Sequence, residues 1–521
     1  MKFKLYISFA VVLLFTIITV VSCDKEVNYT ESLPALTPSS EDETAGSWTM
    51  LLMTSATQVA LAAPSDQASA AYLAEIAAVK KLQGELNNTQ RKAIAYWSGG
   101  GIVRWNQIFR ELVARYNLPP EPLPNGTYPI PDSENPFGFP QFPFSNPPYA
   151  ARAYAYVSAA QYDALKAAWN YKYQTYSTRK MPYQFDSSIK SLLPTSTLPG
   201  YPNEEAVMSG AAAEMLKVLF PAAVEEITLK AAEQRNVALW SGKATASEIK
   251  SSLDLGKNIA ALFITAAKGD KMGGAVGNKT GWDTLANMAT KRGDVAWHSL
   301  ETPRRPPMLP YFGNVTPWAK IMTTPDIISV RPGPPPLAGD AEMDAEVKEV
   351  KWYSDNLTRD RIAIVHKWAD GVSTYTPPGH WNDIAEEYIL DAKFSEVRAA
   401  RAFALLNVTE EHAAIACWDT KFYYYNARPS QLNSAIKTGT GVPNFPSYVS
   451  GHSTFSAAAS DVLSYLFPQD ATEFDALAKE AAASRLYGGI HYKSDCEVGL
   501  KLGSDVATYT LTFAASDGAD Q

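Results

Sequence analysis

Apolar residues recur every three or four positions along most of the chain, which is the spacing of one face of an α-helix. Clear examples are the alanine-rich stretches 68–86 and 206–219. Strict alternation of apolar and polar residues, the mark of a half-buried strand, is scarce. We therefore predict an all-α fold.

The start of the chain has a different pattern. A short basic stretch precedes a nearly unbroken apolar run at 5–21, and Cys23 follows that run. This order is typical of an export signal that is no part of the fold. Residues 20–23, Val-Val-Ser-Cys, resemble a bacterial lipobox, which implies that Cys23 carries a lipid and anchors the mature protein to a membrane of the bacterial cell envelope. A simple signal peptide with an incidental cysteine is the alternative.

The remainder of the chain lacks a second long apolar run. No segment after the signal reaches the roughly 20 apolar residues that a bilayer crossing needs. Residues 24–46 are polar and rich in Ser, Thr and Glu, so we expect a flexible tether there. Attachment to a membrane is therefore expected through the lipid at Cys23 alone.

The helical pattern contains an internal repeat. Ala-Arg-Ala-Tyr at 151–154 matches Ala-Arg-Ala-Phe at 400–403, an offset of 249 residues. The same offset pairs Trp169 with Trp418, Lys172 with Lys421, and Arg179 with Arg428. Chance supplies one such match more easily than several in the same order. We infer two related helical bundles from an internal duplication.

A proline-rich stretch separates the two copies. It contains Pro-Gly-Pro-Pro-Pro at 332–336, which is incompatible with a helix interior. We predict a first bundle at 47–300, a crossing at 301–345 and a second bundle at 346–521.

Charge and cysteine content exclude some functions. The net charge is −8 and no basic stripe is present, which argues against a nucleic-acid partner. Beyond the signal only Cys417 and Cys496 remain, too few for a disulfide framework or a zinc site. Two buried free thiols are the preferred interpretation, and a bridge between them is the alternative.

Three segments of the second copy concentrate reactive side chains. The first is Lys421-x6-Arg428-Pro429, on a helix expected to end at the proline. The second, 446–452, reads Pro-Ser-Tyr-Val-Ser-Gly-His and leads into a helix. The third, 484–495, reads Ser-Arg-x5-His-x3-Asp and spans a Gly-Gly break.

The cations and the helix start of these segments suit a tetrahedral anion. Lys421, Arg428 and Arg485 supply three positive charges. The hydroxyl of Ser450 and the backbone N–H of Gly451 stand at a predicted helix N-terminus, where donors and the macrodipole favour anions. An oxyanion-binding pocket follows.

Two histidines and an aspartate add the reactive groups. Asp495 lies four residues after His491 and is expected one helical turn away, where it can accept the Nδ1 proton. Nε2 of His491 then becomes the reactive atom. His452 can act as a general acid or base. A satisfied buried histidine is the alternative for each.

In this order and spacing, the three segments resemble the signature of the superfamily of vanadium-dependent haloperoxidases and type 2 phosphatidic acid phosphatases. The resemblance implies that the oxygens of vanadate or phosphate are held by Lys421, Arg428, Ser450, Gly451 and Arg485. It implies that His491 is the vanadium ligand or the phosphate nucleophile, and that His452 is the acid/base.

The resemblance leaves three functions open. The preferred one is a haloperoxidase that oxidises halide with hydrogen peroxide, with Lys421 polarising the peroxide. A vanadate-inhibited acid phosphatase, acting on phosphomonoesters through a phosphohistidine, is the alternative. The missing membrane spans favour the first. A non-catalytic lipoprotein that binds an oxyanion or a partner is the third. Related haloperoxidases often pair, so a homodimer is a further expectation.

The resemblance extends to the segment ahead of the lysine motif. Trp-Ala-Asp-Gly at 368–371 is similar to a segment of soluble bacterial members, where Asp370 would pair with an arginine. Phe445 falls where some haloperoxidases place an aromatic residue or a histidine against the oxyanion, although plain core is equally compatible. His380, in an insertion that the first copy lacks, is a candidate for the pocket mouth.

The first copy lacks most of this chemistry. Asn203, Glu204 and Glu205 stand where the second copy has Ser450, Gly451 and His452, and Ala238, Ala244 and Glu248 replace Arg485, His491 and Asp495. The carboxylates would repel an oxyanion. We therefore predict one working site per chain, in the second bundle, with Lys172 and Arg179 as surface or structural residues.

Overall fold

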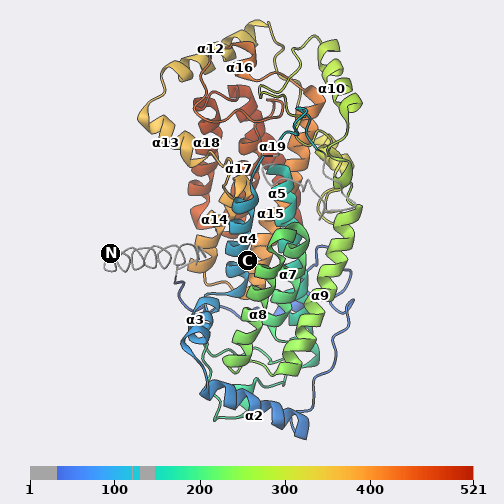
Figure 1. Cartoon of the computed structure of the whole chain (residues 1–521), viewed down its shortest axis with the longest axis vertical. Helices are drawn as coiled ribbons and strands as arrows, with labels where there is room; N and C mark the ends of the chain where they lie inside the picture. The colour runs from blue at the N-terminus through green and yellow to red at the C-terminus, as the bar shows by residue number, and fades with distance from the viewer. Residues whose placement is uncertain (1–31, 120, 130–146, 520–521) are drawn as a thin grey trace, which may run out of the picture. The chain divides into compact units, whose positions relative to one another are not determined.

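A computed structural model describes residues 32–119, 121–129 and 147–519 (Figure 1). Within these residues the chain is helical and contains no β-strand, only one isolated bridge between Ala296 and Asn426. The all-α prediction is confirmed. The export signal, the lipobox at Cys23 and the start of the tether lie outside the described residues. None of the described helices is both long and apolar enough to traverse a bilayer.

The first half of the chain forms one set of helices. Its longer members are α2 (Ala70–Gly84), α3 (Asn88–Trp97), α4 (Gly101–Tyr116), α5 (Pro147–Asn170), α7 (Glu204–Leu219), α8 (Val224–Trp240), α9 (Ala246–Gly269) and α10 (Lys279–Lys291). The predicted helices at 68–86 and 206–219 correspond to α2 and α7. Serine and asparagine begin both helices: Ser69 accepts the N–H of Tyr72, and Asn203 that of Ala206.

The second half forms a comparable set. Its members are α12 (Ala341–Asp355), α13 (Arg359–Lys367), α14 (Thr376–Asp391), α15 (Glu396–Tyr424), α16 (Pro429–Leu432), α17 (Gly451–Leu466), α18 (Ala471–Tyr487) and α19 (Lys493–Ala514). The proline-rich crossing contains only the short η5 (Phe312–Asn314) and α11 (Thr324–Ser329) before α12 begins. Helix α12 thus starts inside the range predicted for the crossing, 301–345.

The two sets share details that an internal duplication predicts. Helices α7 and α17 each have 16 residues, and α8 and α18 each have 17. Arg152 of α5 pairs with Asp270 at 2.6 Å, and Arg401 of α15 pairs with Asp517 at 2.7 Å. The arginines are 249 residues apart and the aspartates 247. These correspondences support the inferred duplication.

Both sets belong to one compact unit, Ala35–Gln521. Helices α5 and α15 lie side by side at its centre (Figure 1). Among the described residues, no other pair of helices shares a more extensive contact. Alanines on both helices are buried, which lets the two backbones approach closely. A hydrogen bond of 2.9 Å from Asn407 to Ser158 links the two helices inside the core.

The last part of the predicted tether, 24–46, is bound to this unit. The N–H of Leu36 donates to the carbonyl of Ser98 at 2.7 Å. The carboxylate of Asp42 is buried and accepts Nε of Arg398 at 2.9 Å. Any free tether therefore ends before Leu36.

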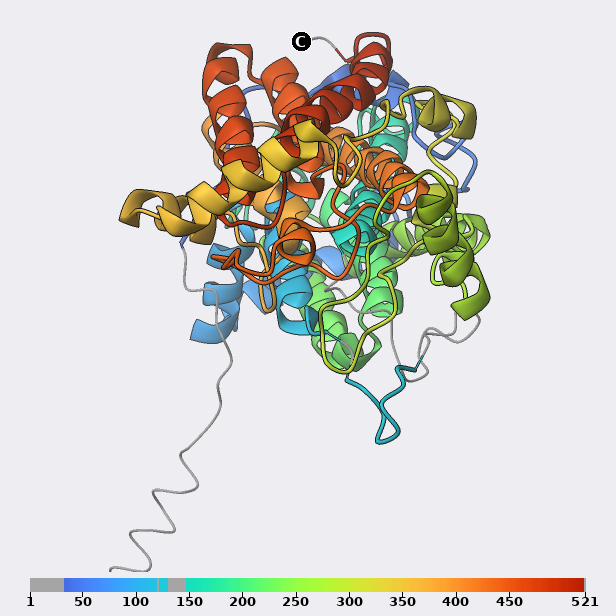
Figure 2. The ribbon, with the colours of Figure 1, turned by 90° about the horizontal axis from the view of Figure 1, so that it is seen from above.

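Helix α12 covers one side of the second set. Figure 2 shows it running across the C-terminal helices, and it contacts α18 and α19. Met343 and Val350 of α12 pack into a buried cluster with Leu486, Tyr492 and Cys496. This cluster adjoins Arg485 and His491 in the chain, so α12 helps to exclude water from the candidate site.

Candidate active site

Lys421 lies in the last turn of α15, and the helix ends sooner than predicted. Helix α15 stops at Tyr424 because Tyr425 adopts a left-handed conformation with φ of 57° and returns its N–H to the carbonyl of Lys421 at 2.8 Å. The prediction that the helix continues to Pro429 is wrong. Arg428 instead caps the start of the short helix α16.

The ammonium of Lys421 is fully buried and held by backbone carbonyls. It donates to Pro446 at 3.0 Å, to Ser447 at 2.9 Å and to Val449. Burial lowers the pKa of Lys421 to about 7 because desolvation disfavours the charged form. The lysine is therefore poised near neutral pH and grips the loop that carries the second motif.

Arg428 is buried beside His491 with one nitrogen unused. Its Nε donates to the carbonyl of Phe445 at 2.9 Å and its Nη1 to that of Ile490 at 2.8 Å. Nη2 has no hydrogen-bond partner among the described residues. Burial lowers the pKa of Arg428 to about 10, so the group stays charged at neutral pH. An unpaired buried donor costs about 1–3 kcal/mol, which indicates that an acceptor is missing here.

His491 lies between Asp495 and Arg428. Its Nδ1 is 2.8 Å from Oδ2 of Asp495, and its Nε2 is 2.9 Å from Nη1 of Arg428. The guanidinium can only donate, so Nε2 carries the lone pair and Nδ1 the proton. Burial, with the nearby charges of Arg428 and Lys421, holds the pKa of His491 well below its usual value. The imidazole is neutral, with Nε2 as its nucleophilic atom.

Asp495 reaches His491 from the first turn of α19. His491 itself precedes that helix, whereas the sequence suggested that both residues share it. Oδ2 of Asp495 also accepts the N–H of Tyr492 at 3.1 Å and the hydroxyl of Ser447. Sequence reasoning assigned no role to Ser447, although its place inside the second motif was a usable signal.

The start of α17 presents Ser450 and Gly451 as predicted from the sequence. Oγ of Ser450 accepts the N–H of Ser453 at 3.3 Å, and the N–H of Ser450 donates to the carbonyl of Asp495 at 2.9 Å. A methyl group added at Gly451 would meet only side-chain carbons of Phe455 and Trp418, at 3.8 Å. The positive end of the helix dipole is thus open to an anion.

Arg485 is buried at the end of α18. Its Nε donates to Oγ of Ser484 at 2.8 Å, and its Nη2 donates to the carbonyls of Val365 and Trp368. Burial lowers its pKa to about 10, against the favourable charge of Asp370. The expected arginine partner of Asp370 is thus near, but the hydrogen bonds that the structure gives this carboxylate are to His380.

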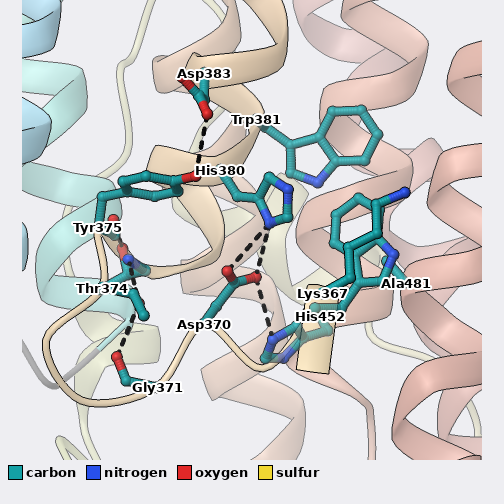
Figure 3. Close-up of polar contacts among 12 residues, drawn as sticks. Lys367, Asp370, Gly371, Thr374, Tyr375, His380, Trp381, Asp383, His452 and Ala481 are labelled. Carbon is teal, nitrogen blue, oxygen red and sulfur yellow. Dashed lines mark hydrogen bonds and ion pairs between the residues drawn. The ribbon is translucent and has the colours of Figure 1, made fainter. Parts of the chain in front are cut away.

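His452 is the more exposed of the two histidines of the site. Its side chain is 17% exposed, against 3% for His491. Nε2 has no hydrogen-bond partner among the described residues, and its nearest carboxylate oxygen is Oδ2 of Asp370 at 3.7 Å (Figure 3). Burial and the charge of Arg485 hold the pKa of His452 well below its usual value. A neutral imidazole with a free ring nitrogen is available to a reactant.

Phe445 is a core residue whose ring also lies beside two cations of the site. Its side chain is buried, and its ring lies 4.9 Å from Nζ of Lys421 and 4.9 Å from the guanidinium carbon of Arg428. Aromatic faces attract cations at this range. Nearby, Cys417 and Cys496 are buried free thiols, as preferred from the sequence.

Residues 401–517 match the family model of the PAP2 superfamily. This part of the chain, which holds every residue of the candidate site, is therefore similar to that superfamily. No curated protein matches the sequence.

Three solved structures share the fold of this chain. A bacterial vanadium-dependent iodoperoxidase has a TM-score of 0.57 and 21% identity, over 79% of this chain and 95% of that one. An apo-type bacterial vanadium-dependent chloroperoxidase has a TM-score of 0.51 and 15% identity, over 71% of this chain and 93% of that one. A holo-type bacterial vanadium-dependent chloroperoxidase has a TM-score of 0.50 and 16% identity, over 74% of this chain and 96% of that one. At these identities the likeness establishes the fold.

The counterpart of the candidate site in the first set of helices contains two ion pairs. Lys172 is fully buried, donates to the carbonyl of Pro199 at 2.6 Å and lies 2.9 Å from Glu204. Arg179 pairs with Glu248 at 2.7 Å. Both cations are therefore structural rather than surface residues, and each is neutralised by a carboxylate.

Proposed function

We propose that this enzyme is a vanadate-binding haloperoxidase that oxidises halide with hydrogen peroxide. The observation that carries the proposal is the buried pair of His491 and Arg428. His491 is neutral with its lone pair on Nε2, beside Arg428, whose Nη2 has no partner among the described residues. Three cations, Arg428, Lys421 and Arg485, and one carboxylate, Asp495, leave the site with a positive balance, which suits a tetrahedral oxyanion with an electrophilic centre.

The donor set fits vanadate. Two guanidinium groups and a helix start offer donors to several oxygens, and the Lys421 ammonium adds positive charge. Buried atoms at the site that lack partners among the described residues are Arg428 Nη2, His452 Nε2, Ser453 Oγ and Asp495 Oδ1. Vanadate, when bound, supplies a Lewis-acidic centre that activates hydrogen peroxide toward halide.

The side chains divide the remaining work. Asp495 keeps the proton on Nδ1 of His491, so that Nε2 faces the centre of the oxyanion. Arg428 and Arg485 offset negative charge on its oxygens. Lys421 adds a proton donor whose pKa of about 7 suits exchange near neutral pH. His452, the more exposed histidine, takes up or returns the proton of the entering peroxide.

The structural neighbours favour the peroxidase over the phosphatase. All three are described as vanadium-dependent peroxidases, and each is covered over at least 93% of its length. Their identity to this chain is low, so they support the proposal without naming the halide.

Phosphatase activity is the second candidate because the same pocket suits phosphate. Nε2 of His491 would attack phosphorus while His452 protonates the leaving alcohol, and water would then cleave the phosphohistidine. The match to the PAP2 superfamily is the observation that supports it.

One experiment separates the candidates. Purified full chain is loaded with orthovanadate and given peroxide, iodide or bromide and a halogen-trapping dye, in parallel with a phosphomonoester. Halogenation that requires vanadate supports the peroxidase, whereas hydrolysis that vanadate inhibits supports the phosphatase. Absence of both activities, with unchanged vanadate binding in His491→Ala, would leave a non-catalytic lipoprotein.

We further propose that the enzyme is exported and anchored by lipid at Cys23 in the cell envelope. The chain becomes part of the compact unit at Ala35, which leaves roughly a dozen residues after Cys23 as a spacer. Metabolic labelling with palmitate checks this, and loss of label in Cys23→Ser is the expected result. Equal label in the variant would contradict the anchor.

A further inference from the structure

The carboxylate of Asp370 faces two imidazoles at once. Its Oδ1 and Oδ2 lie 3.1 and 3.3 Å from Nδ1 of His380, and Oδ2 lies 3.7 Å from Nε2 of His452. Figure 3 shows the carboxylate between the two rings. The three side chains are 6%, 14% and 17% exposed, so one negative charge serves two imidazoles in a largely dehydrated place.

The loop that carries Asp370 is held in place by the first set of helices. Asp370 has a φ of 43°, in the left-handed region, at the turn after α13. The side-chain amide of Asn117 donates to the carbonyls of Gly371 at 2.7 Å and Thr374 at 2.8 Å. Asn117 is itself buried, so this loop is pinned from outside the second set.

His380 is likewise fixed in orientation. It lies in the first turns of α14 and stacks on Trp368, with ring centroids 4.4 Å apart and an angle of 26°. The backbone of Trp368 is hydrogen-bonded to His452, and its carbonyl accepts Nη2 of Arg485. One tryptophan thus connects His380 to two residues of the candidate site.

We propose that His380 is a positioning residue for His452 and acts through the Asp370 carboxylate. The proposal rests on the proposed function, in which His452 handles the proton of the reactant. His380 donates Nδ1–H to Asp370, which holds the carboxylate in place and draws part of its negative charge away from His452. His452 therefore stays neutral and ready to accept a proton.

Asp370 is the charged neighbour of His452 that favours its protonated form. Arg485 of α18 and Lys421 of α15 both lower the pKa of His452, as does His380 of α14. Facing Asp370 there is also Tyr375, whose hydroxyl bonds to Asp383 at 3.1 Å. Beyond Trp368, Lys367 and Glu480 form an ion pair of 2.7 Å. Among the described residues, Asp370 is therefore the carboxylate that lies next to His452 and can stabilise its protonated form.

Two substitutions at His380 separate positioning from packing. His380→Asn retains a donor near the place of Nδ1 but removes the ring, whereas His380→Phe retains a ring for Trp368 but removes the donor. We expect His380→Phe to lower the turnover number about tenfold, as loss of a supporting hydrogen bond does at comparable sites. We expect His380→Asn to restore turnover to within about threefold of the original chain. The opposite order would show a packing role and overturn the proposal.

A double substitution tests whether Asp370 is the intermediary. If it is, His380→Phe causes no further loss of turnover in a chain that already carries Asp370→Asn. Additive losses would contradict transmission through the carboxylate. Both measurements use the activity that the full chain displays, halogenation or hydrolysis.

A readout without turnover keeps this proposal distinct from the proposed function. Diethyl pyrocarbonate modifies neutral imidazole, and mass spectrometry follows its rate at His452 against pH. The midpoint should move to higher pH in His380→Phe, because the Asp370 carboxylate then no longer shares its negative charge with His380. It should move to lower pH in Asp370→Asn, because the counter-charge is gone. Unchanged midpoints in both variants would overturn the proposal even in a chain with neither activity.

Discussion

The pocket of the second helix set and its counterpart in the first differ in what balances their buried cations. In the second, Lys421 and Arg428 are held by backbone carbonyls and a neutral imidazole, and Arg428 keeps an unpaired nitrogen. In the first, the equivalent Lys172 and Arg179 each contact a carboxylate. The same helical frame therefore holds an unsatisfied positive pocket on one side and closed ion pairs on the other.

The difference teaches that cations alone do not make an oxyanion site. A buried cation whose partners are dipoles retains attraction for an anion, whereas one paired with a carboxylate has little left. In the second pocket, Asp495 also holds an imidazole, His491, with its Nε2 beside Arg428, whereas the first has Ala244 in that place and offers no such group. The carboxylate of Glu248 instead accepts hydrogen bonds from Arg179.

The largest expected effect comes from removing the reactive imidazole. His491→Ala should lower turnover at least about 1,000-fold, because no other imidazole is held by Asp495 beside Arg428. Initial rates of halogenation and of phosphomonoester hydrolysis measure it. His366→Ala, at an exposed position of α13, is the matched control and should retain full activity. Substantial activity in His491→Ala would remove the distinction between the two pockets.

The next largest effect should distinguish Asp495 from its counterpart in the first set, Glu248. Asp495→Asn should lower turnover about 10- to 100-fold, because the amide no longer enforces the proton on Nδ1 of His491. Glu248→Gln should leave turnover unchanged but destabilise the fold by about 3 kcal/mol, because Arg179 becomes a buried unpaired charge. Kinetics and denaturant unfolding of both variants test this. A turnover defect in Glu248→Gln would mean that the first pocket contributes to catalysis.

A smaller effect concerns the pH dependence of anion binding. Lys421 loses its proton as pH rises through its pKa of about 7, so vanadate affinity should fall by about tenfold toward alkaline pH with the loss of one charge-assisted hydrogen bond. A bound anion moves the midpoint upward. In Lys421→Arg the group stays charged and the decline should flatten. Titration calorimetry of both proteins across the same pH range checks this, and parallel curves would exclude Lys421 as the titrating group.

The smallest effect is a change in stability from the first pocket. Burial and the neighbouring Glu396 raise the pKa of Glu205, the counterpart of His452, to about 8. Between its ordinary value of 4.5 and about 8, the unfolded chain releases this proton while the folded chain retains it. Stability therefore falls as pH rises through that window.

Glu205→Gln should remove this decline. We expect a gain on the order of 1–3 kcal/mol at pH 8 and little change at pH 4.5. Thermal unfolding at the two pH values measures the difference. An equal shift at both values would show that the substitution acts by packing rather than by protonation.

The sequence predicted the elements of the fold better than their ends. The apolar spacing indicated α2 and α7 correctly, because that spacing directly reflects which face of a helix is buried. The end of α15 was placed at Pro429, since proline was the visible breaker. The structure ends it at Tyr424, where Tyr425 turns into the left-handed region, an event that no residue type at this position announces.

The candidate site was predictable where residues lie close in the chain. The four-residue spacing of His491 and Asp495 suggested their hydrogen bond, and the structure brings them to 2.8 Å. The partners of Asp370 were not predictable in this way. Its distance to His380 and His452 depends on how Asn117, 253 residues earlier, holds its loop.

The sequence by itself determined that the chain is helical and predicted that its halves are related and that the second half carries the oxyanion motifs, because helical periodicity and motif spacing are local properties. Only the tertiary structure decided which cations remain unbalanced. The charge state of a buried group depends on desolvation and on neighbours distant in sequence, and both exist only once the helices have packed.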